Sequence, residues 1–344
     1  MRHLWQAGFA ALCLSTACAP IAHAAAPAYS LAQTIPLGGA AHWDYLHYHA
    51  ATGQLFIAHG KAVSVVDMAS GKVQGNVTGL DDTHGIAFDP ATGDGYTDSS
   101  GTRTLSEFDP ATLKVMKTLP SLEDTDGMVF DAASHDIFVA AGDSQAVLAL
   151  DPATDQETKI DLPGKPEYLV ADGQGRLYVA LNDKNQIAVV DTEAKKLVTS
   201  DALPGCAAPT GMAMDTATMR VFASCQNGKL AVVNAKTGAM VALLNIGKGS
   251  DSAAFDAKRH LVFSANSTGT LSVIREIDAD HYQALAPVKT EIGARTMALD
   301  EANGDVFLVT ATPQGKGKVK HPGFAPRYNF EPGTLRLLVY KPAS

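Results

Sequence analysis

Seven residues with reactive or ligating side chains occupy one repeated position in this 344-residue chain. Each directly precedes a short apolar stretch, as His84 does in "THGIAFDP" and Asp126 does in "TDGMVFDA". The set holds four carboxylates, one imidazole, one hydroxyl and one guanidinium: Asp44, His84, Asp126, Glu167, Thr210, Asp251 and Arg295. Carboxylates that lie close together raise one another's pKa or recruit a cation. If the seven positions converge in space, the sequence predicts an acidic site.

The acidic excess predicts a divalent cation as cofactor. Arg295 and a protonated His84 can offset two carboxylates, and the remaining charge suits Ca²⁺ or Mg²⁺ with oxygen ligands, or Zn²⁺ or Mn²⁺ if His84 joins. The candidate metal ligands are Asp44, Asp126, Glu167 and Asp251. A competing interpretation is that each polar side chain only bonds loop backbone or channel water.

The same residues predict a chemistry. In a metal-assisted hydrolase or lyase the ion would polarise a carbonyl or activate water, and an acid or His84 would act as general base. Arg295 would then hold an oxyanion or a carboxylate. The candidate catalytic residues are therefore His84, Asp126, Glu167 and Arg295, and the candidate ligand contacts include Asp44, Thr210 and Asp251.

A repeat covers most of the chain and carries these residues. The apolar stretches end at His49, Asp89, Asp131, Asp172, Asp215, Asp256 and Asp300, which are 40 to 44 residues apart. Each copy contains short, alternating or β-branched runs between Gly, Asp, Asn and Pro turns, which is typical of four strands. A period of this length predicts an all-β fold, a seven-bladed β-propeller of four-stranded blades over residues 25–344. The acidic strand ends are interpreted as turn-formers on the opposite side from the seven residues.

The two ends of the chain predict closure of the ring. The last copy stops after its third strand, at residues 335–340, and the segment "YSLAQTIPL" (29–37) resembles a fourth strand that precedes the first copy. Pairing these two segments would complete the last blade and remove an exposed sheet edge.

A basic insertion, residues 311–333, separates the second and third strands of the last copy. Lys316, Lys318, Lys320, His321 and Arg327 make it the most basic segment, and Phe324, Tyr328 and Phe330 add aromatic surface. Long loops without secondary structure of their own are often lids or binding loops. We expect a lid over the acidic site, with His321, Arg327 and Tyr328 as ligand contacts; a loop packed on its own blade is the competitor.

The N-terminus is typical of a bacterial signal peptide, residues 1–24. A basic start, an apolar run from Leu4 to Ala17 and the small-x-small pattern "AHA" predict cleavage near Ala24 and a periplasmic or secreted protein. Lipidation of Cys18 is the alternative. Cleavage would leave Cys206 and Cys225, which an oxidising compartment would pair as a disulfide; a metal site would need further ligands nearby.

Charge and missing motifs limit the function. Loss of Arg2 leaves 26 basic and 36 acidic residues, a net charge of −10, which disfavours nucleic acid as a partner although the basic insertion could act locally. The sequence has no phosphate loop, nucleophile elbow or covalent haem motif, and no later apolar run long enough to span a membrane. We expect a monomer that binds a small polar molecule, either as a metal-dependent, lactonase-like hydrolase or lyase, or as a non-catalytic binding or scaffold module.

Several phrases resemble a known family. The "LYVA…VVD" and "DPATG" stretches, with "GKPEYLVADGQGRLYV" (164–179), "PTGMAMD" (209–215) and "GARTMALD" (293–300), resemble the YVTN-repeat propellers of the YncE-like family. The resemblance implies the propeller fold, whereas propellers host lyases, lactonases, dehydrogenases and binding modules alike. It also implies aromatic or basic residues where this chain carries acids, so the acidic set is a departure from the ordinary repeat.

Overall fold

The computed structural model describes Met1, residues 28–319 and residues 321–343. Apart from Met1, the predicted signal peptide and the alternative lipidation site at Cys18 lie outside the described residues. None of the described residues belongs to a helix that is long and apolar enough to cross a membrane.

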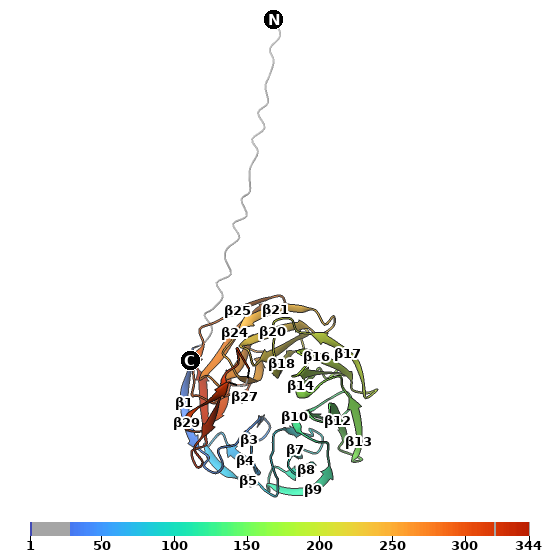
Figure 1. Ribbon diagram of the computed structural model, residues 1–344, viewed down its shortest axis with the longest axis vertical. Helices are drawn as coiled ribbons and strands as arrows, with labels where there is room; N and C mark the ends of the chain where they lie inside the picture. Colours follow the sequence, from blue (N-terminus) through green and yellow to red (C-terminus); the bar gives the residue numbers. More distant parts are fainter. Residues whose placement is uncertain (2–27, 320, 344) are drawn as a thin grey trace.

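Seven antiparallel sheets form a closed ring, and the chain visits them in order, which confirms the predicted seven-bladed propeller (Figure 1). Each of the first six blades begins with the strand nearest the ring centre and proceeds outward. The first three blades are β2 (Leu46–His49), β3 (Gln54–His59), β4 (Ala62–Asp67) and β5 (Lys72–Val77); β6 (Ile86–Phe88), β7 (Gly95–Ser99), β8 (Thr104–Asp109) and β9 (Lys114–Pro120); and β10 (Thr125–Phe130), β11 (Ile137–Ala141), β12 (Ala146–Asp151) and β13 (Gln156–Asp161).

Blades four to six continue the pattern. Their strands are β14 (Pro166–Ala171), β15 (Arg176–Leu181), β16 (Gln186–Asp191) and β17 (Lys196–Ala202); β18 (Pro209–Asp215), β19 (Arg220–Cys225), β20 (Lys229–Asn234) and β21 (Met240–Asn245); and β22 (Ser250–Asp256), β23 (Leu261–Asn266), β24 (Thr270–Asp278) and β25 (His281–Ala284), with the short β26 (Val288–Lys289) also paired to β24.

The last blade is built from both ends of the chain. Strands β27 (Met297–Asp300), β28 (Asp305–Thr310) and β31 (Arg336–Pro342) come from the C-terminal part, and β1 (Tyr29–Pro36) pairs with β31 as the outermost strand. The register runs from Tyr29 opposite Pro342 to Pro36 opposite Arg336. The closure predicted from the sequence is confirmed.

Packing between neighbouring blades forms the core. The second strand of each blade is buried along its whole length or nearly so, whereas the outermost strands are largely exposed. In all seven blades that second strand carries a buried aromatic side chain at the same place in the repeat: Phe56, Tyr96, Phe138, Tyr178, Phe222, Phe263 and Phe307. β-Branched and aromatic residues fit such a pleated surface between two sheets. The core therefore consists of layers between blades, and the centre of the ring is left for polar residues.

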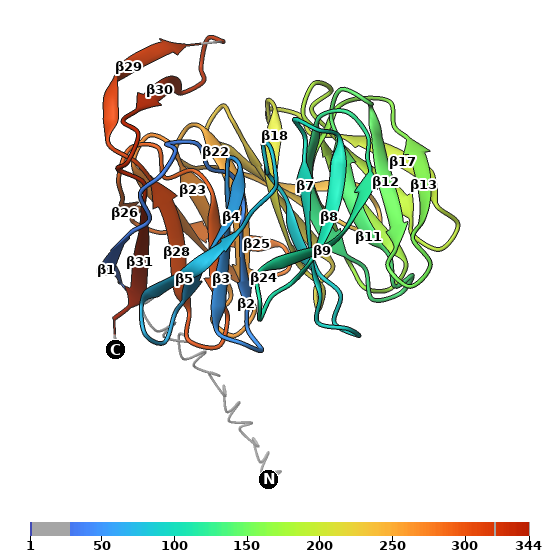
Figure 2. The ribbon, with the colours of Figure 1, turned by 90° about the horizontal axis from the view of Figure 1, so that it is seen from below.

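The insertion in the last blade differs from the prediction. Residues expected to form a loop without secondary structure form the hairpin β29 (Pro313–Val319) and β30 (Pro326–Phe330), which rises above the ring (Figure 2). Lys316 lies opposite Tyr328 in its register. A side chain at Gly317 would collide with the backbone carbonyl of Arg327, so glycine permits the close crossing of the two strands.

Candidate functional site

The seven repeated residues lie at the start of the innermost strands. Asp126, Glu167, Thr210 and Asp251 are each the second residue of such a strand, while Asp44, His84 and Arg295 lie just before one. In β10, β14, β18 and β22 the pairing register shifts at this residue or beside it. A β-bulge of this kind changes the direction of a side chain and is common beside functional sites. The prediction of position is correct to within one or two residues.

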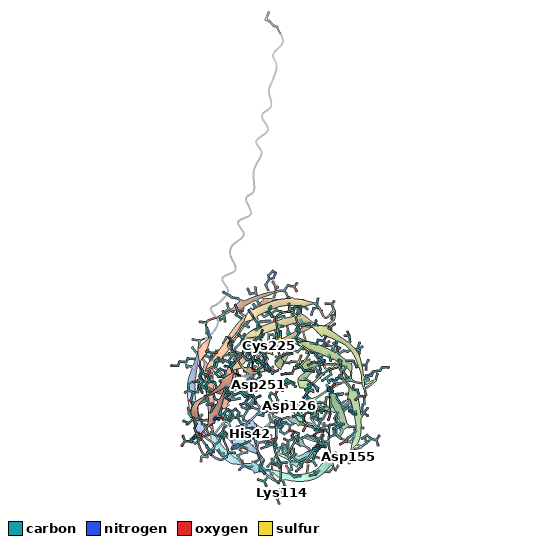
Figure 3. All side chains as sticks on the ribbon, viewed as in Figure 1. His42, Lys114, Asp126, Asp155, Cys225 and Asp251 are labelled. Carbon is teal, nitrogen blue, oxygen red and sulfur yellow. A yellow bond between two sulfur atoms is a disulfide. The ribbon has the colours of Figure 1, made fainter. Side chains whose placement is uncertain are left out.

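The structure brings most of these residues together near the middle of the ring. Figure 3 shows Asp126 and Asp251 close to the centre. The charges that act on Asp126 come from Glu167, Asp44, Asp251 and Asp98. We call Asp44, Asp126, Glu167 and Asp251 the channel acids.

One channel acid is paired with the arginine. The Arg295 side chain donates from Nε to Asp251 Oδ2 at 2.7 Å and from Nη2 to the backbone oxygen of Trp43 at 2.9 Å. Its guanidinium also lies 5.3 Å from the centre of the Trp43 ring, a cation–π contact. Gln226 donates to Asp251 Oδ1 at 3.1 Å. These contacts join blades one, five, six and seven and leave Asp251 well satisfied.

The histidine is paired with an aspartate that the sequence analysis did not single out. Asp98, on β7, is fully buried and accepts hydrogen bonds from the backbone N–H groups of His84 and Gly85, both at 2.8 Å, and from the Thr125 hydroxyl at 2.9 Å. Its Oδ2 lies 3.1 Å from His84 Nδ1. Burial alone would lower the pKa of His84, but the hydrogen bond and charge of Asp98 raise that pKa to about 9. His84 is therefore an imidazolium at neutral pH, already matched to one carboxylate.

Thr210 has a different role from its counterparts. Its side chain is buried, and its hydroxyl donates to the backbone oxygen of Ser250 at 2.6 Å. The contact ties the innermost strand of blade five to that of blade six, so Thr210 acts as a structural tether.

Three channel acids have no hydrogen-bond partner among the described residues: Asp44, Asp126 and Glu167. The Oδ1 atom of Asp126 is shielded from solvent and still unsatisfied. Burial raises the pKa of Glu167 to about 8, with Asp251 and Asp44 adding repulsion, and burial with the charge of Glu167 raises the pKa of Asp126 well above its ordinary value. Burial raises the pKa of Asp44 to about 6, against the pull of Arg295 and His84. At neutral pH Glu167 is therefore largely protonated, whereas Asp44 is largely ionised.

The arrangement is poorly suited to one metal ion. Within residues 28–319 and 321–343, no three His, Cys, Asp or Glu side chains converge closely enough to hold a metal. The channel acids perturb one another's pKa values, but Mg²⁺ and Ca²⁺ require several oxygen ligands at about 2.0–2.6 Å from one point. The metal site remains a prediction from the sequence.

A cavity of about 970 Å³ opens beside these residues. Its wall includes Glu167, Thr210, Asp251 and Arg295 from the repeated position, together with the amides Asn182 and Gln226. On the hairpin side it is lined by seven residues of the insertion, which include His321, Arg327, Tyr328 and Phe330. The structure thus brings the basic insertion beside the acidic residues, while His84, Asp44 and Asp126 lie outside this lining.

The sequence analysis missed an important wall residue, Trp43. Its side chain is 1% exposed, lines the cavity and packs edge-on against Phe330 with ring centres 4.9 Å apart. Its indole N–H has no acceptor among the described residues. Its position directly before Asp44 was the available signal in the sequence.

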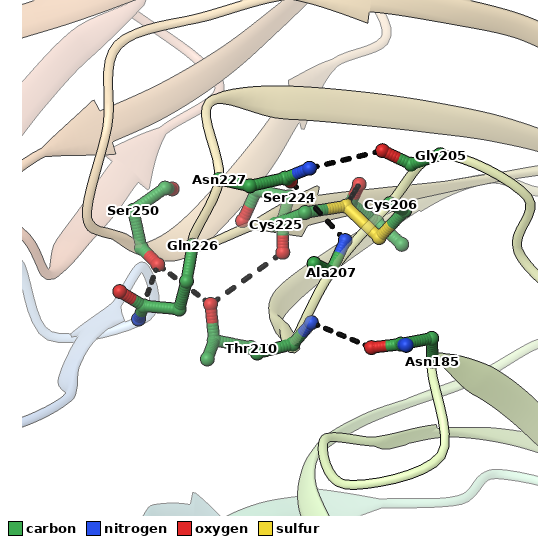
Figure 4. The surroundings of a disulfide bond; sticks show 12 residues. Asn185, Gly205, Cys206, Ala207, Thr210, Ser224, Cys225, Gln226, Asn227 and Ser250 are labelled. Atoms are coloured by element: carbon green, nitrogen blue, oxygen red, sulfur yellow. Dashed lines mark hydrogen bonds between the residues drawn. A yellow bond between two sulfur atoms is a disulfide. The ribbon is translucent and has the colours of Figure 1, made fainter. Parts of the chain in front are cut away.

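The predicted disulfide joins Cys206, in the segment before β18, to Cys225 at the end of β19, with their Cα atoms 5.6 Å apart (Figure 4). The residues that follow the two cysteines, Ala207 and Gln226, both line the cavity. Asn227 reinforces the link, because it accepts from the Ala207 N–H at 3.1 Å and donates to the Gly205 oxygen at 3.0 Å. The disulfide therefore fixes one side of the cavity wall.

A second, smaller cavity of about 300 Å³ lies further along the innermost strands. Its wall is largely apolar, with Ile86, Phe88, Met128 and Phe130. Tyr45 and Tyr168, whose ring centres are 4.6 Å apart, also line it. Each tyrosine directly follows a channel acid in the sequence, so the polarity of the centre changes abruptly along the strands.

Comparisons with known proteins support the fold alone. No family model matches the chain and no curated protein matches it, so the resemblance to the YncE-like family remains a prediction. Among solved structures, the chain is similar to Kuenenia stuttgartiensis hydrazine synthase, with a TM-score of 0.67 and 14% identity over 79% of this chain and 92% of that one. It is also similar to U3-55K (TM-score 0.71, 8% identity, 92% and 98% covered) and to the WD40 repeats of RRP9 (0.73, 9%, 92% and 99%). Identities this low show a shared seven-bladed β-propeller, an architecture compatible with binding or scaffold roles.

Proposed function

We propose that this protein binds a small polar ligand in the cavity between the incoming ends of the innermost strands and the β29–β30 hairpin. The cavity itself carries the proposal, because about 970 Å³ lies in the size range of small-molecule sites. Aromatic faces from Trp43 and Tyr328 stand near a few polar groups, including Glu167 and Arg327. This mixture is typical of pockets that orient a ligand by a small number of polar contacts.

The hairpin supports a binding role over a scaffold role. It is anchored through Phe330, which packs against Trp43, and through the backbone bond from Glu331 N to Thr312 O at 2.8 Å. Beyond this anchor the strand residues of β29 are mostly exposed, so little of the blade depends on them. A segment fixed at its base and open at its tip is suited to close over a ligand.

A screen of small polar compounds by thermal shift, followed by calorimetry, tests the proposal. We expect binding by the intact protein and a loss of at least tenfold in affinity when residues 314–329 are replaced by a short turn. Arg327→Ala should weaken binding, and Lys316→Ala is the matched control, because both residues are hairpin cations and only Arg327 lines the cavity. Equal affinity in all three variants would contradict the proposal.

A hydrolase or lyase is the second candidate, and the contact between His84 and Asp98 favours it. A buried carboxylate that orients an imidazole is the arrangement of an acid–base residue and its partner. With its pKa raised to about 9, His84 would act as an acid, in contrast to the general base predicted from the sequence. Turnover of esters and lactones that is lost in His84→Gln, with the fold intact, would support this candidate.

The compartment follows from the disulfide. Disulfides persist in oxidising environments, so Cys206–Cys225 favours an exported protein, in agreement with the signal peptide predicted from the sequence. Periplasmic and whole-cell fractions of an expressing bacterium, compared by immunoblot, would test this location.

A further inference from the structure

We propose that the bound ligand carries a protonated amine or guanidinium group, which is held at the floor of the cavity by Glu167 together with the unpaired acids Asp44 and Asp126. This inference rests on the proposed function and narrows the ligand to organic cations on a small polar scaffold.

The first support is a count of opposite charges at the centre of the ring. Two cations, His84 and Arg295, are committed to Asp98 and Asp251 at 3.1 and 2.7 Å. This leaves three carboxylic acids without a counter-ion among the described residues: Asp44, Asp126 and Glu167. All three side chains are half-buried, and a carboxylate partly removed from water without a partner is unfavourable, so the site is complementary to an incoming positive charge.

The second support is hydrogen bonding. Asp126 Oδ1 is shielded from solvent and has no donor among the described residues, and an acceptor atom left in this state is unfavourable. Ammonium and guanidinium groups supply three and five N–H donors respectively. A cationic ligand would therefore provide both the missing charge and the missing donors.

Spacing favours an organic cation over a metal ion. A metal needs several ligand atoms at about 2.0–2.6 Å from one point, and no three acidic or histidine side chains converge in this way in the described part of the chain. A guanidinium or an amine on a scaffold spreads its donors over a wider region, so it can bridge carboxylates that share no metal-sized centre.

The cavity provides both access and a place for the rest of the ligand. Glu167 lines the cavity and interacts electrostatically with Asp44 and Asp126, so a cation bound at this wall would act on all three acids. Trp43 lines the same cavity, and its indole N–H has no acceptor within the described part of the chain. Arg327 and His321 contribute cationic or donor groups on the hairpin side. These groups call for acceptors, such as hydroxyl or carboxylate oxygens, on the scaffold that carries the amine.

Two pairs of matched probes test the charge requirement by calorimetry at neutral pH. Glucosamine is compared with glucose, and L-arginine with L-citrulline, because each pair keeps its scaffold and differs in the cationic group. We expect the cationic member of at least one pair to bind at least tenfold more tightly than its neutral partner. Equal or tighter binding of the neutral member in both pairs, or no binding by glucosamine and L-arginine, would overturn the inference.

Variants locate the effect. Glu167→Gln should reduce binding of the cationic probe at least tenfold and leave the neutral probe unchanged, and Asp126→Asn should act in the same direction should Glu167→Gln fail to fold. Glu193→Gln, an exposed acid on a turn far from the cavity wall, is the matched control and should change nothing.

Two further outcomes separate this inference from the alternatives. Neutral probes that bind tightly and lose affinity on hairpin replacement would preserve the proposed function and reject the cation. Stabilisation by Ca²⁺ or Mg²⁺ that is reversed by EDTA and absent in Glu167→Gln would instead support the metal site predicted from the sequence and reject the organic cation.

Discussion

Each innermost strand has acidic residues near the end where the chain enters it (the incoming end) and at the end where the chain leaves it (the outgoing end). The acids at the two ends differ in their hydrogen bonding. At the outgoing ends, six aspartates each accept a hydrogen bond of 2.8–3.0 Å from a backbone N–H in the turn that follows: Asp89, Asp131, Asp172, Asp215, Asp256 and Asp300. At the incoming ends, Asp44, Asp126 and Glu167 accept none from the described residues. The outgoing aspartates therefore stabilise turns, whereas three of the four channel acids at the incoming ends have no hydrogen-bond partner among the described residues.

This difference in hydrogen bonding distinguishes the repeated acids that serve local structure from those that indicate a functional site. An Asp that bonds the amides of its own turn is explained by local structure, and the sequence interpretation of the outgoing acids as turn-formers is confirmed. A half-buried acid without a partner, such as Glu167, lowers stability and has no local explanation. Exceptions of this kind, where a local rule is broken within a regular repeat, are expected at functional sites.

Removal of the disulfide, which lies at the incoming end of blade five, should cause the largest loss of stability. Its loop spans 19 residues of sequence, and constraint of the unfolded chain by such a loop stabilises by about 3 kcal/mol. We expect the double variant Cys206→Ala, Cys225→Ala to lose about that much free energy of unfolding in urea titrations and to bind ligand more weakly, because Ala207 and Gln226 flank the bond. Unchanged ligand affinity at a lowered stability would show that the cavity wall does not depend on this link.

Among substitutions of the acids, those at the outgoing ends should cause the larger loss of stability. Asp256 is fully buried and accepts from the Arg259 N–H at 3.0 Å and from Arg259 Nη1 at 2.8 Å. We expect Asp256→Ala to lower the free energy of unfolding by about 2 kcal/mol, the range for hydrogen bonds to a charged group, with no change in ligand affinity. If Asp256→Ala were as stable as the wild type, the outgoing acids could not be distinguished from the incoming acids by their contribution to stability.

Much of this comparison was accessible from the sequence because it depends on local repetition. The 40 to 44-residue period predicted the blades, and the orphan segment 29–37 predicted the closing strand. The role of Asp98 was not accessible, since it looks like one polar residue in a strand until β7 places it under His84. The contact of Trp43 with Phe330 and the lack of partners for Asp126 depend on segments far apart in the chain, which no local pattern encodes. The sequence also did not predict that the insertion forms a hairpin. Its strands are rich in Gly, Lys and Pro, which are uncommon in strands.

At the incoming end, replacing an acid by its neutral amide should stabilise the protein, whereas loss of an outgoing acid should destabilise it. The pKa of Glu167 is raised to about 8 from its ordinary 4.5, so across this window the folded chain holds a proton that the unfolded chain has released. The free energy of unfolding should therefore fall as the pH rises from 4.5 to 8, by at most about 1.4 kcal/mol per pH unit for this group. Glu167→Gln should flatten that slope and stabilise the protein above pH 7.

Urea titrations at pH 5, 6, 7 and 8 measure this slope, and Glu193→Gln serves as the exposed control. A wild-type stability that rises with pH over this range, or an unchanged slope in Glu167→Gln, would show that Glu167 is charged and satisfied in the folded protein. The incoming and outgoing acids would then differ only in position.

We expect the smallest loss of stability from substitution of Thr210. This residue occupies the same repeated position as the channel acids but carries no carboxylate, so it tests whether the position or the acid matters. Its hydroxyl donates to the Ser250 oxygen at 2.6 Å, and a buried neutral hydrogen bond of this kind contributes about 1 kcal/mol. Thr210→Val keeps the β-branched shape and removes the bond, so urea titrations should show a loss of about 1 kcal/mol. Ligand affinity should change less than in Glu167→Gln, although both residues line the cavity. A larger loss of affinity in Thr210→Val would mean that the position as a whole, and not the unpaired acids within it, determines binding.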